Sequence, residues 1–295
     1  MKPVIVSAAA IALVALAGPA LASPGPEVEI DNAVARVAIV VEDRTDIAVE
    51  IEQGTSSLPA LRVSRDGDNV RIDGGLRRRG LFSGGGFIRN CRSGPAGGEP
   101  GAGASVEVRR VGRVNLSDAP LIVIRTPRAV DVDASGAVFG SVGRGATSVD
   151  LANGGCGHWN VANTEGPVSL SVAGSGDMRA GTSTALDISI GGSGSVTAGA
   201  TGALDISIGG SGNVVVARVD GPTDVSIGGS GDVVIRAGTA PDLSISIAGS
   251  GDVNFGGVAG DVSVSVVGAG DVTVARATGS VSRSVVGSGD VRIGN

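Results

Sequence analysis

The 295-residue sequence contains no tyrosine, one tryptophan and four phenylalanines. Proteins that stack nucleic-acid bases need aromatic platforms, and sugar-binding clefts commonly use them too, so this chain offers few sites of either kind. Lysine is nearly absent as well. Lys2 is the only one, and the chain after residue 22 carries 22 arginines against 29 acidic residues, a net charge of −7. That acidic balance disfavours nucleic acid and anionic lipid as partners.

Long hydrophobic runs are missing except at the N-terminus. Residues 1–22 have a positive start at Lys2, an apolar run from Val4 to Ala17 and a small-residue cleavage site at Ala20-Leu21-Ala22, which is typical of a signal peptide. The apolar run is short for a membrane span. We therefore expect an exported protein without a membrane span after signal cleavage, located in the periplasm or at the cell surface.

One sequence repeat occurs seven times between Pro167 and Asn295, and each copy contains a Gly-x-Gly motif at a predicted turn. Apolar residues alternate with serine before each turn, and a second apolar pair follows it. This period of two predicts a strand, a glycine turn and another strand in every copy. We expect glycine there because it adopts backbone angles that other residues resist. The residues that close the seven turns lie 18 to 20 positions apart: Asp177, Ser195, Asn213, Asp232, Asp252, Asp271 and Asp290.

A period near 19 residues with short strands is typical of a solenoid, in which each copy buries its apolar face against its neighbours. Two degenerate copies precede the clear ones, with turns closing at Ala137 and His158. Helical patterns are absent after the signal peptide. The sequence therefore predicts an all-β fold, a parallel, right-handed β-solenoid of about nine rungs.

The chain before the solenoid divides into two parts. Residues 23–75 contain two predicted hairpins, one joining 37–41 to 47–51 and one joining 61–63 to 70–72, which would form an N-terminal cap or the first turns of the coil. Residues 76–104 are rich in Gly, Arg and Pro and include Arg77-Arg78-Arg79, so we expect a long loop. The solenoid domain then covers residues 105–295.

The turns written Gly-Ser-Gly-Asp-Val, as at Gly229 to Val233 and Gly249 to Val253, resemble bacterial proteins of the family "putative auto-transporter adhesin, head GIN domain". Strands such as Val262 to Ser265 fit the family as well. The resemblance covers roughly residues 105–295. It implies a β-solenoid of the cell envelope or surface and carries no catalytic residues. Ser195 and Asn213 replace the Asp of the motif, and no translocator barrel follows.

Aspartates at equivalent positions form two candidate ladders. The first stands at the turns, at Asp177, Asp232, Asp252, Asp271 and Asp290; the second lies eight residues before the turns, at Asp187, Asp205 and Asp224. Like charges one strand apart repel, so backbone N–H bonds or bound cations should offset them. The calcium-binding repeat Gly-Gly-x-Gly-x-Asp has its Asp one place later and a nine-residue period. We favour a structural role in the turns over a calcium site, and predict no cofactor.

The sequence contains few candidates for a catalytic nucleophile paired with a base. Cys156 and His158 would need a third orienting group and a pocket to act as a dyad, and Trp159 occupies an inward, core position. An exported chain with two cysteines favours a Cys91–Cys156 disulfide, with free thiols as the alternative. The outward serines lack matched His or acid partners, so we expect no catalytic residues.

Two classes of function remain beside calcium-dependent binding. The favoured one is a non-enzymatic, adhesin-like protein whose elongated faces contact an unidentified macromolecule of the envelope or surface. The other is a β-helical enzyme acting on polysaccharide, whose active site would lie near residues 76–160. In the last rung Arg283 stands where the other copies have Leu, Ile or Val. A charge there would block edge-to-edge stacking, so we expect a monomer.

Overall fold

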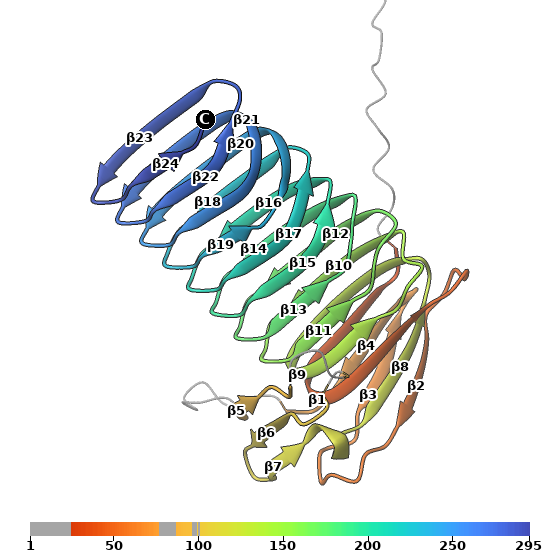
Figure 1. Cartoon of the computed structure of the whole chain (residues 1–295). Helices are drawn as coiled ribbons and strands as arrows, with labels where there is room; N and C mark the ends of the chain where they lie inside the picture. Colours follow the sequence, from red (N-terminus) through yellow and green to blue (C-terminus); the bar gives the residue numbers. More distant parts are fainter. Residues whose placement is uncertain (1–24, 77–86, 96–98, 100) are drawn as a thin grey trace, which may run out of the picture.

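The computed structural model describes residues 25–76, 87–95, 99 and 101–295. Over these ranges the chain is almost entirely β-structure, with one 3₁₀ helix, η1 (Leu116–Asp118). Its main body is a stack of rungs that climbs from the N-terminal strands to the C-terminus (Figure 1). Two sheets run along this stack, and their strands are parallel from rung to rung. The prediction of a parallel β-solenoid of about nine turns is confirmed.

The first sheet contains the strands that precede each glycine turn. Its register places like residues beside like, as in the pairs Ile188–Ile206 and Ser189–Ser207. Three of its strands, β9, β20 and β21, also pair with strands of the second sheet. In order, the sheet joins β9 (Ala129–Val142), β10 (Ser148–Asn153), β12 (Pro167–Val172), β14 (Ala185–Ile190), β16 (Ala203–Ile208), β18 (Thr223–Ile227), β20 (Gly238–Gly249), β21 (Val253–Gly268) and β23 (Val281–Gly287).

The second sheet contains the strands that follow the turns. The apolar residues of both sheets point into one core that extends from Val28 to Val291. Period-two alternation is what allows each strand to contribute one face to this core while its other face meets solvent. From the end of β9, the sheet joins β11 (His158–Val161), β13 (Asp177–Ala180), β15 (Val196–Thr201), β17 (Val214–Asp220), β19 (Val233–Ile235), the start of β21, β22 (Val272–Ala277) and β24 (Val291–Ile293).

The N-terminal end of the coil is built around β1 (Glu27–Val41), which is itself a rung. One edge of β1 pairs in parallel with β9. Its other edge pairs in parallel with β4 (Asn69–Asp73) and then with β8 (Leu121–Thr126). Two antiparallel strands finish this end: β3 (Arg62–Asp66) on β4, and β2 (Ala48–Glu52) on β8.

One of the two predicted hairpins is therefore confirmed and the other is wrong. The strands β3 and β4 form the expected hairpin. Residues 37–41 do not pair with 47–51, because both edges of β1 are taken by parallel partners that bury its apolar residues, and β2 joins the far edge of β8 instead.

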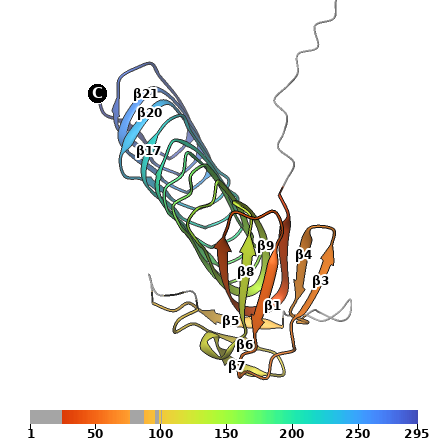
Figure 2. The ribbon, with the colours of Figure 1, turned by 90° about the vertical axis from the view of Figure 1, so that its right-hand side faces the viewer.

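A small antiparallel sheet lies beside the first rungs. It consists of β5 (Ile88–Arg92), β6 (Ser105–Val108) and β7 (Gly112–Asn115), which lie together at the N-terminal end of the coil (Figure 2). Its apolar residues pack in one cluster with Phe139 of β9. Residues 88–92 fall in the segment expected as a loop, so that expectation is wrong for this stretch. The triple arginine at 77–79 and the predicted signal peptide at 1–22 lie outside the described residues.

Most turn positions are glycine because the rungs stack too closely to leave room for a side chain. A Cβ on Gly212 would lie 2.6 Å from Cγ2 of Ile190 and closer still to the carbonyl oxygen of Gly194, in the rung below. Gly212 has no left-handed backbone angle, whereas Gly249, Gly268 and Gly287 do, with φ of +153°, +137° and +133°. The expectation that glycine supplies unusual angles thus applies to part of the turns. The general reason is that one backbone passes directly over another.

Candidate binding groove

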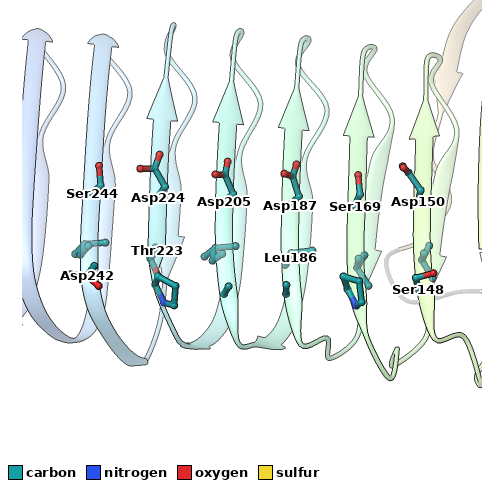
Figure 3. A pocket seen from close by; sticks show the side chains of 18 of the residues that line it. Ser148, Asp150, Ser169, Leu186, Asp187, Asp205, Thr223, Asp224, Asp242 and Ser244 are labelled. Atoms are coloured by element: carbon teal, nitrogen blue, oxygen red, sulfur yellow. The ribbon is translucent and has the colours of Figure 1, made fainter. Parts of the chain in front are cut away.

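A shallow groove of about 930 Å³ runs along the first sheet from Ala129 to Ser282. Figure 3 shows the strands that form it side by side, with the lining side chains at corresponding places. In most rungs three adjacent residues contribute, for example Ala203, Leu204 and Asp205 at the start of β16. The groove is therefore linear, and its pattern is set by the register of the sheet.

The three residues of each rung have different roles because side chains alternate across a strand. The middle residue, such as Leu186 or Leu204, is buried in the core. The first and third residues point outward and form two columns. The small-residue column comprises Ala129, Ser148, Pro167, Ala185, Ala203 and Pro222, and continues as Asp242, Asp261 and Ser280; the aspartate column comprises Asp131, Asp150, Ser169, Asp187, Asp205 and Asp224, and continues as Ser244, Ser263 and Ser282.

The groove is negatively charged along most of its length. Its lining includes Asp131, Asp150, Asp187, Asp205, Asp224, Asp242 and Asp261 and contains no Arg, Lys or His. Asp261 accepts hydrogen bonds from the backbone N–H and the hydroxyl of Ser280, at 2.7 and 2.8 Å. The other six form no hydrogen bond or ion pair with any residue that the structure describes.

Repulsion between these carboxylates is substantial. Asp187, Asp205 and Asp224 are direct neighbours in the register, and paired strands lie about 4.8 Å apart. Two unit charges at that distance repel by about 0.9 kcal/mol in water and about 3.5 kcal/mol at the effective dielectric near a protein surface. Burial and then the charges of Asp187 and Asp224 raise the pKa of Asp205. At the N-terminal end, burial and then Asp150, Glu27 and Asp133 raise the pKa of Asp131 to about 6.

The aspartates at the turns, here called the turn ladder, differ from the groove aspartates because their carboxylates accept hydrogen bonds from the backbone. The Oδ1 atoms of Asp232, Asp252 and Asp271 accept the backbone N–H of the corresponding residue in the next rung, at 3.0, 2.8 and 2.9 Å. Asp177 accepts the N–H of Ser195 in the same way, at 3.1 Å. The bonds thus join successive rungs instead of closing a single turn.

A neutral side chain performs the same task at one rung. Asn213 accepts the backbone N–H of Asp232 through its Oδ1, at 3.0 Å. An amide oxygen therefore makes the same rung-to-rung bond as a carboxylate oxygen, and the bond does not depend on the negative charge. Within the described parts of the chain, no three or more Asp, Glu, His or Cys side chains come together as a metal site.

The remaining sequence candidates are placed as follows. Cys91 and Cys156 form a disulfide with Cα atoms 6.2 Å apart, which ties β5 to the turn before β11. The Cys156 sulfur is consequently not a free thiol beside His158, whose ring Nε2 is 3.1 Å from Oδ1 of Asn160. Trp159 is fully buried, so its core assignment is confirmed. Arg283 is aligned with Val264 but lies on the exposed outer strand β23.

Sequence reasoning found part of the groove. It grouped Asp187, Asp205 and Asp224 but missed Asp131, Asp150, Asp242 and Asp261, and it gave no role to the small-residue column. Asp150 lies eight residues before the turn at His158, the same offset as the three grouped aspartates, so it could have been included from the turns alone. Asp131 lies six residues before its turn and joins the column only when the rungs are aligned at their strand starts. The change of column at Asp242 and Asp261 has a weaker signal, because it appears only when two outward positions are compared together.

Comparison with known proteins finds one matching family and similar solved structures. Residues 220–295 match the model of the family described as "Putative auto-transporter adhesin, head GIN domain", and the resemblance carried by the turn motif is confirmed there. A crystal structure of a putative adhesin from Parabacteroides distasonis ATCC 8503 is 18% identical, with a TM-score of 0.50 over 92% of this chain and 93% of that chain. A putative adhesin from Bacteroides fragilis NCTC 9343 is 10% identical, with a TM-score of 0.36 over 92% of each chain.

These similarities differ in what they support. The Parabacteroides structure supports the fold, since at 18% identity likeness extends to architecture alone. No curated protein matches the chain. Over the described ranges, no helix is long and apolar enough to cross a membrane.

Proposed function

Starting from the match of residues 220–295 to an adhesin family, we propose that this chain is an exported, non-enzymatic binding protein of the cell envelope or surface. Its groove would hold an extended macromolecule. The single observation that carries this proposal is the continuity of the groove, which repeats the same lining positions over successive rungs from Ala129 to Ser282.

The dimensions of the groove favour a linear polymer. Eight steps of about 4.8 Å separate the nine rungs, so the groove is about 38 Å long. Its volume of about 930 Å³ is spread over that length. A compact ligand would be bound by a few convergent groups in a concave pocket. Repeated shallow contacts instead suit a chain that lies along the coil.

The arrangement of the carboxylates favours binding over hydrolysis. Glycosidases use two carboxyl groups that flank the scissile bond, one as acid and one as base or nucleophile. Here Asp187, Asp205 and Asp224 project in the same direction from neighbouring strands (Figure 3). They lie on one side of the groove, and the facing column at these rungs consists of Ala185, Ala203 and Pro222. The polysaccharide-active enzyme is therefore the weaker alternative.

The test is to fill the groove without changing the rest of the surface. The double variant Ala185→Trp/Ala203→Trp places two large side chains in the small-residue column. The matched control Thr197→Trp/Asn254→Trp places the same two side chains on exposed positions of the second sheet. Circular dichroism would verify that both variants fold.

Binding is measured with fluorescently labelled residues 23–295 and sedimented envelope fractions of the producing bacterium. We expect the groove variant to retain less than about a tenth of the wild-type binding and the control to retain most of it, because only the first blocks the central contacts. Equal binding of both variants would contradict the proposal.

A further inference from the structure

The occupant of the groove can be specified further, on the premise that the groove is the binding site. We propose that it takes an extended, lysine-rich polypeptide segment, whose ammonium groups pair with the groove aspartates while the lysine stems lie on the small-residue column.

The first support is the contrast between the two aspartate ladders. The turn carboxylates receive backbone N–H donors from the next rung. At equal spacing on the same coil, Asp187, Asp205 and Asp224 have no donor and no counter-charge among the described residues. A fold built of stacked repeats can satisfy such a column internally, as the turn ladder demonstrates. The groove column keeps its carboxylates available to a cationic partner.

The second support is how far the charge extends. Seven aspartates occupy seven of the eight rungs from Asp131 to Asp261, with Ser169 as the interruption. The charge crosses from the aspartate column to the small-residue column at Asp242, so the negative path runs slightly obliquely along the groove. Seven steps of about 4.8 Å cover about 34 Å, the length of about ten residues of extended polypeptide at 3.4 Å each. A negative path of this length can contact many cationic groups of one extended segment at once, which favours a polymer over a small cation.

The third support is the chemistry of the small-residue column. Ala185, Ala203, Pro167 and Pro222 provide a low, largely apolar surface beside the carboxylates. Lysine suits this combination, because its four-carbon stem covers apolar surface while its ammonium group stays at a polar site. The favoured partner is therefore both cationic and aliphatic.

Recognition of this segment depends on side chains and does not extend the sheet. The strands from β9 to β21 that carry the groove aspartates already pair on both sides with neighbouring rungs, as β16 does with β14 and β18. The outer strand β23 pairs with β21 alone and contributes only Ser282 to the groove. No strand edge is open along the groove between these rungs, so a bound peptide cannot add as another strand. A segment of D-lysine should consequently bind about as well as one of L-lysine.

The test uses a fluorescein-labelled deca-L-lysine and the disulfide-intact chain 23–295, followed by fluorescence anisotropy at 50 mM salt. The groove variant is Asp187→Asn/Asp205→Asn/Asp224→Asn. The control is Asp232→Asn/Asp252→Asn/Asp271→Asn, which removes the same three charges from the turn ladder. The asparagine oxygens of the control should preserve the rung-to-rung bonds, since Asn213 already makes one.

We expect the groove variant to bind roughly 10- to 100-fold more weakly than wild type, the effect of losing three exposed ion pairs. The control should change the affinity by less than about threefold, and deca-D-lysine should bind within about threefold of the L-peptide. Equal weakening by both variants would show that only net charge matters, and would overturn the proposal. A large loss with the D-peptide, absence of wild-type binding, or equally tight binding of spermine would overturn it as well.

Failure of this inference is distinguishable from failure of the proposed function. If Ala185→Trp/Ala203→Trp abolishes envelope binding while deca-lysine does not bind, the groove is a binding site for another polymer and the lysine-rich occupant is wrong. If the filled groove leaves envelope binding unchanged, the proposed function itself is wrong.

Discussion

Replacing Gly212 by alanine would insert a methyl group between two stacked rungs. Its Cβ would meet Cγ2 of Ile190 at 2.6 Å and the carbonyl oxygen of Gly194 at a shorter distance still. The side chain could turn away, but the carbonyl belongs to the backbone of a paired rung. Relief therefore requires the local rung spacing to increase. Overpacking of this kind costs about 1–3 kcal/mol, and a backbone obstacle favours the upper end.

The same turn provides a matched control at Gly209. A Cβ there would have its nearest neighbour, the carbonyl oxygen of Ile190, at 3.8 Å, which is an ordinary contact. Gly209 also has no left-handed backbone angle. Alanine at this site should be neutral or stabilise the chain by up to about 1 kcal/mol, because it restricts the unfolded state. Gly209→Ala and Gly212→Ala each add one methyl group to the same turn and differ only in where that group lies.

Thermal unfolding of the two variants measures the difference. A gap of about 2–4 kcal/mol corresponds to roughly 4–16 °C in Tm for a chain of this size, with Gly212→Ala the lower. Calorimetry with the disulfide intact in both variants provides the comparison. Equal Tm values would refute the argument that close stacking of rungs selects glycine at this position.

Four further outcomes are expected. Millimolar calcium should change Tm by less than about 2 °C relative to EGTA, since the turn carboxylates are occupied by N–H donors and no three acidic side chains converge on one point among the described residues; a rise above about 10 °C, several kcal/mol for a chain this long, would contradict this. Mass spectrometry of the unreduced chain should find no alkylatable thiol at Cys91 or Cys156, whose closed loop of 65 residues contributes about 4 kcal/mol; two free thiols would disprove the bridge. The pKa of Asp131 is about 6 in the folded chain against a usual 3.8. Between pH 3.8 and pH 6 the folded chain therefore binds a proton that the unfolded chain has lost, so the native state gains stability as pH falls through 6. Because Asp131 is only partly buried, solvent screening reduces this effect to about 1 kcal/mol. Asp131→Asn should therefore raise Tm by roughly 2–4 °C at pH 7.5 and leave it nearly unchanged near pH 4; an equal shift at both pH values would argue against a partly buried, repelled charge. Finally, Arg283→Val should increase self-association in analytical ultracentrifugation, because an apolar outer strand invites stacking; a variant as monomeric as wild type would remove the capping role.

Much of the solenoid could be predicted from the sequence because its information is local. Alternation of Ile206, Ser207 and Ile208 sets which side chains face the core, and strand geometry alone enforces that rule. Repetition every 18 to 20 residues then places Ile188 beside Ile206, as the register confirms. The same alternation predicts an inward position for Trp159, which is fully buried in the structure.

The partners of the N-terminal strands depended on long-range closure. A short connection after Val41 suggests a hairpin, and β2 has the alternation that a hairpin strand needs. In the folded chain β1 is enclosed between β9 and β8, 80 or more residues away along the chain. Burial of both edges of a core rung outweighs the small entropic saving of a local turn. Sequence spacing contains no measure of that competition.

The two aspartate ladders show the same division most clearly. In the sequence they are equivalent, each an Asp repeated at a constant place in the copies. The folded coil brings the oxygen of Asp252 to the N–H of Asp271 at 2.8 Å, where it becomes part of the structure. It leaves Asp205 in a groove with no internal partner among the described residues. Repetition determined that both columns exist, whereas the position of each carboxylate relative to the next backbone decided which column is bonded from rung to rung and which lies in the groove.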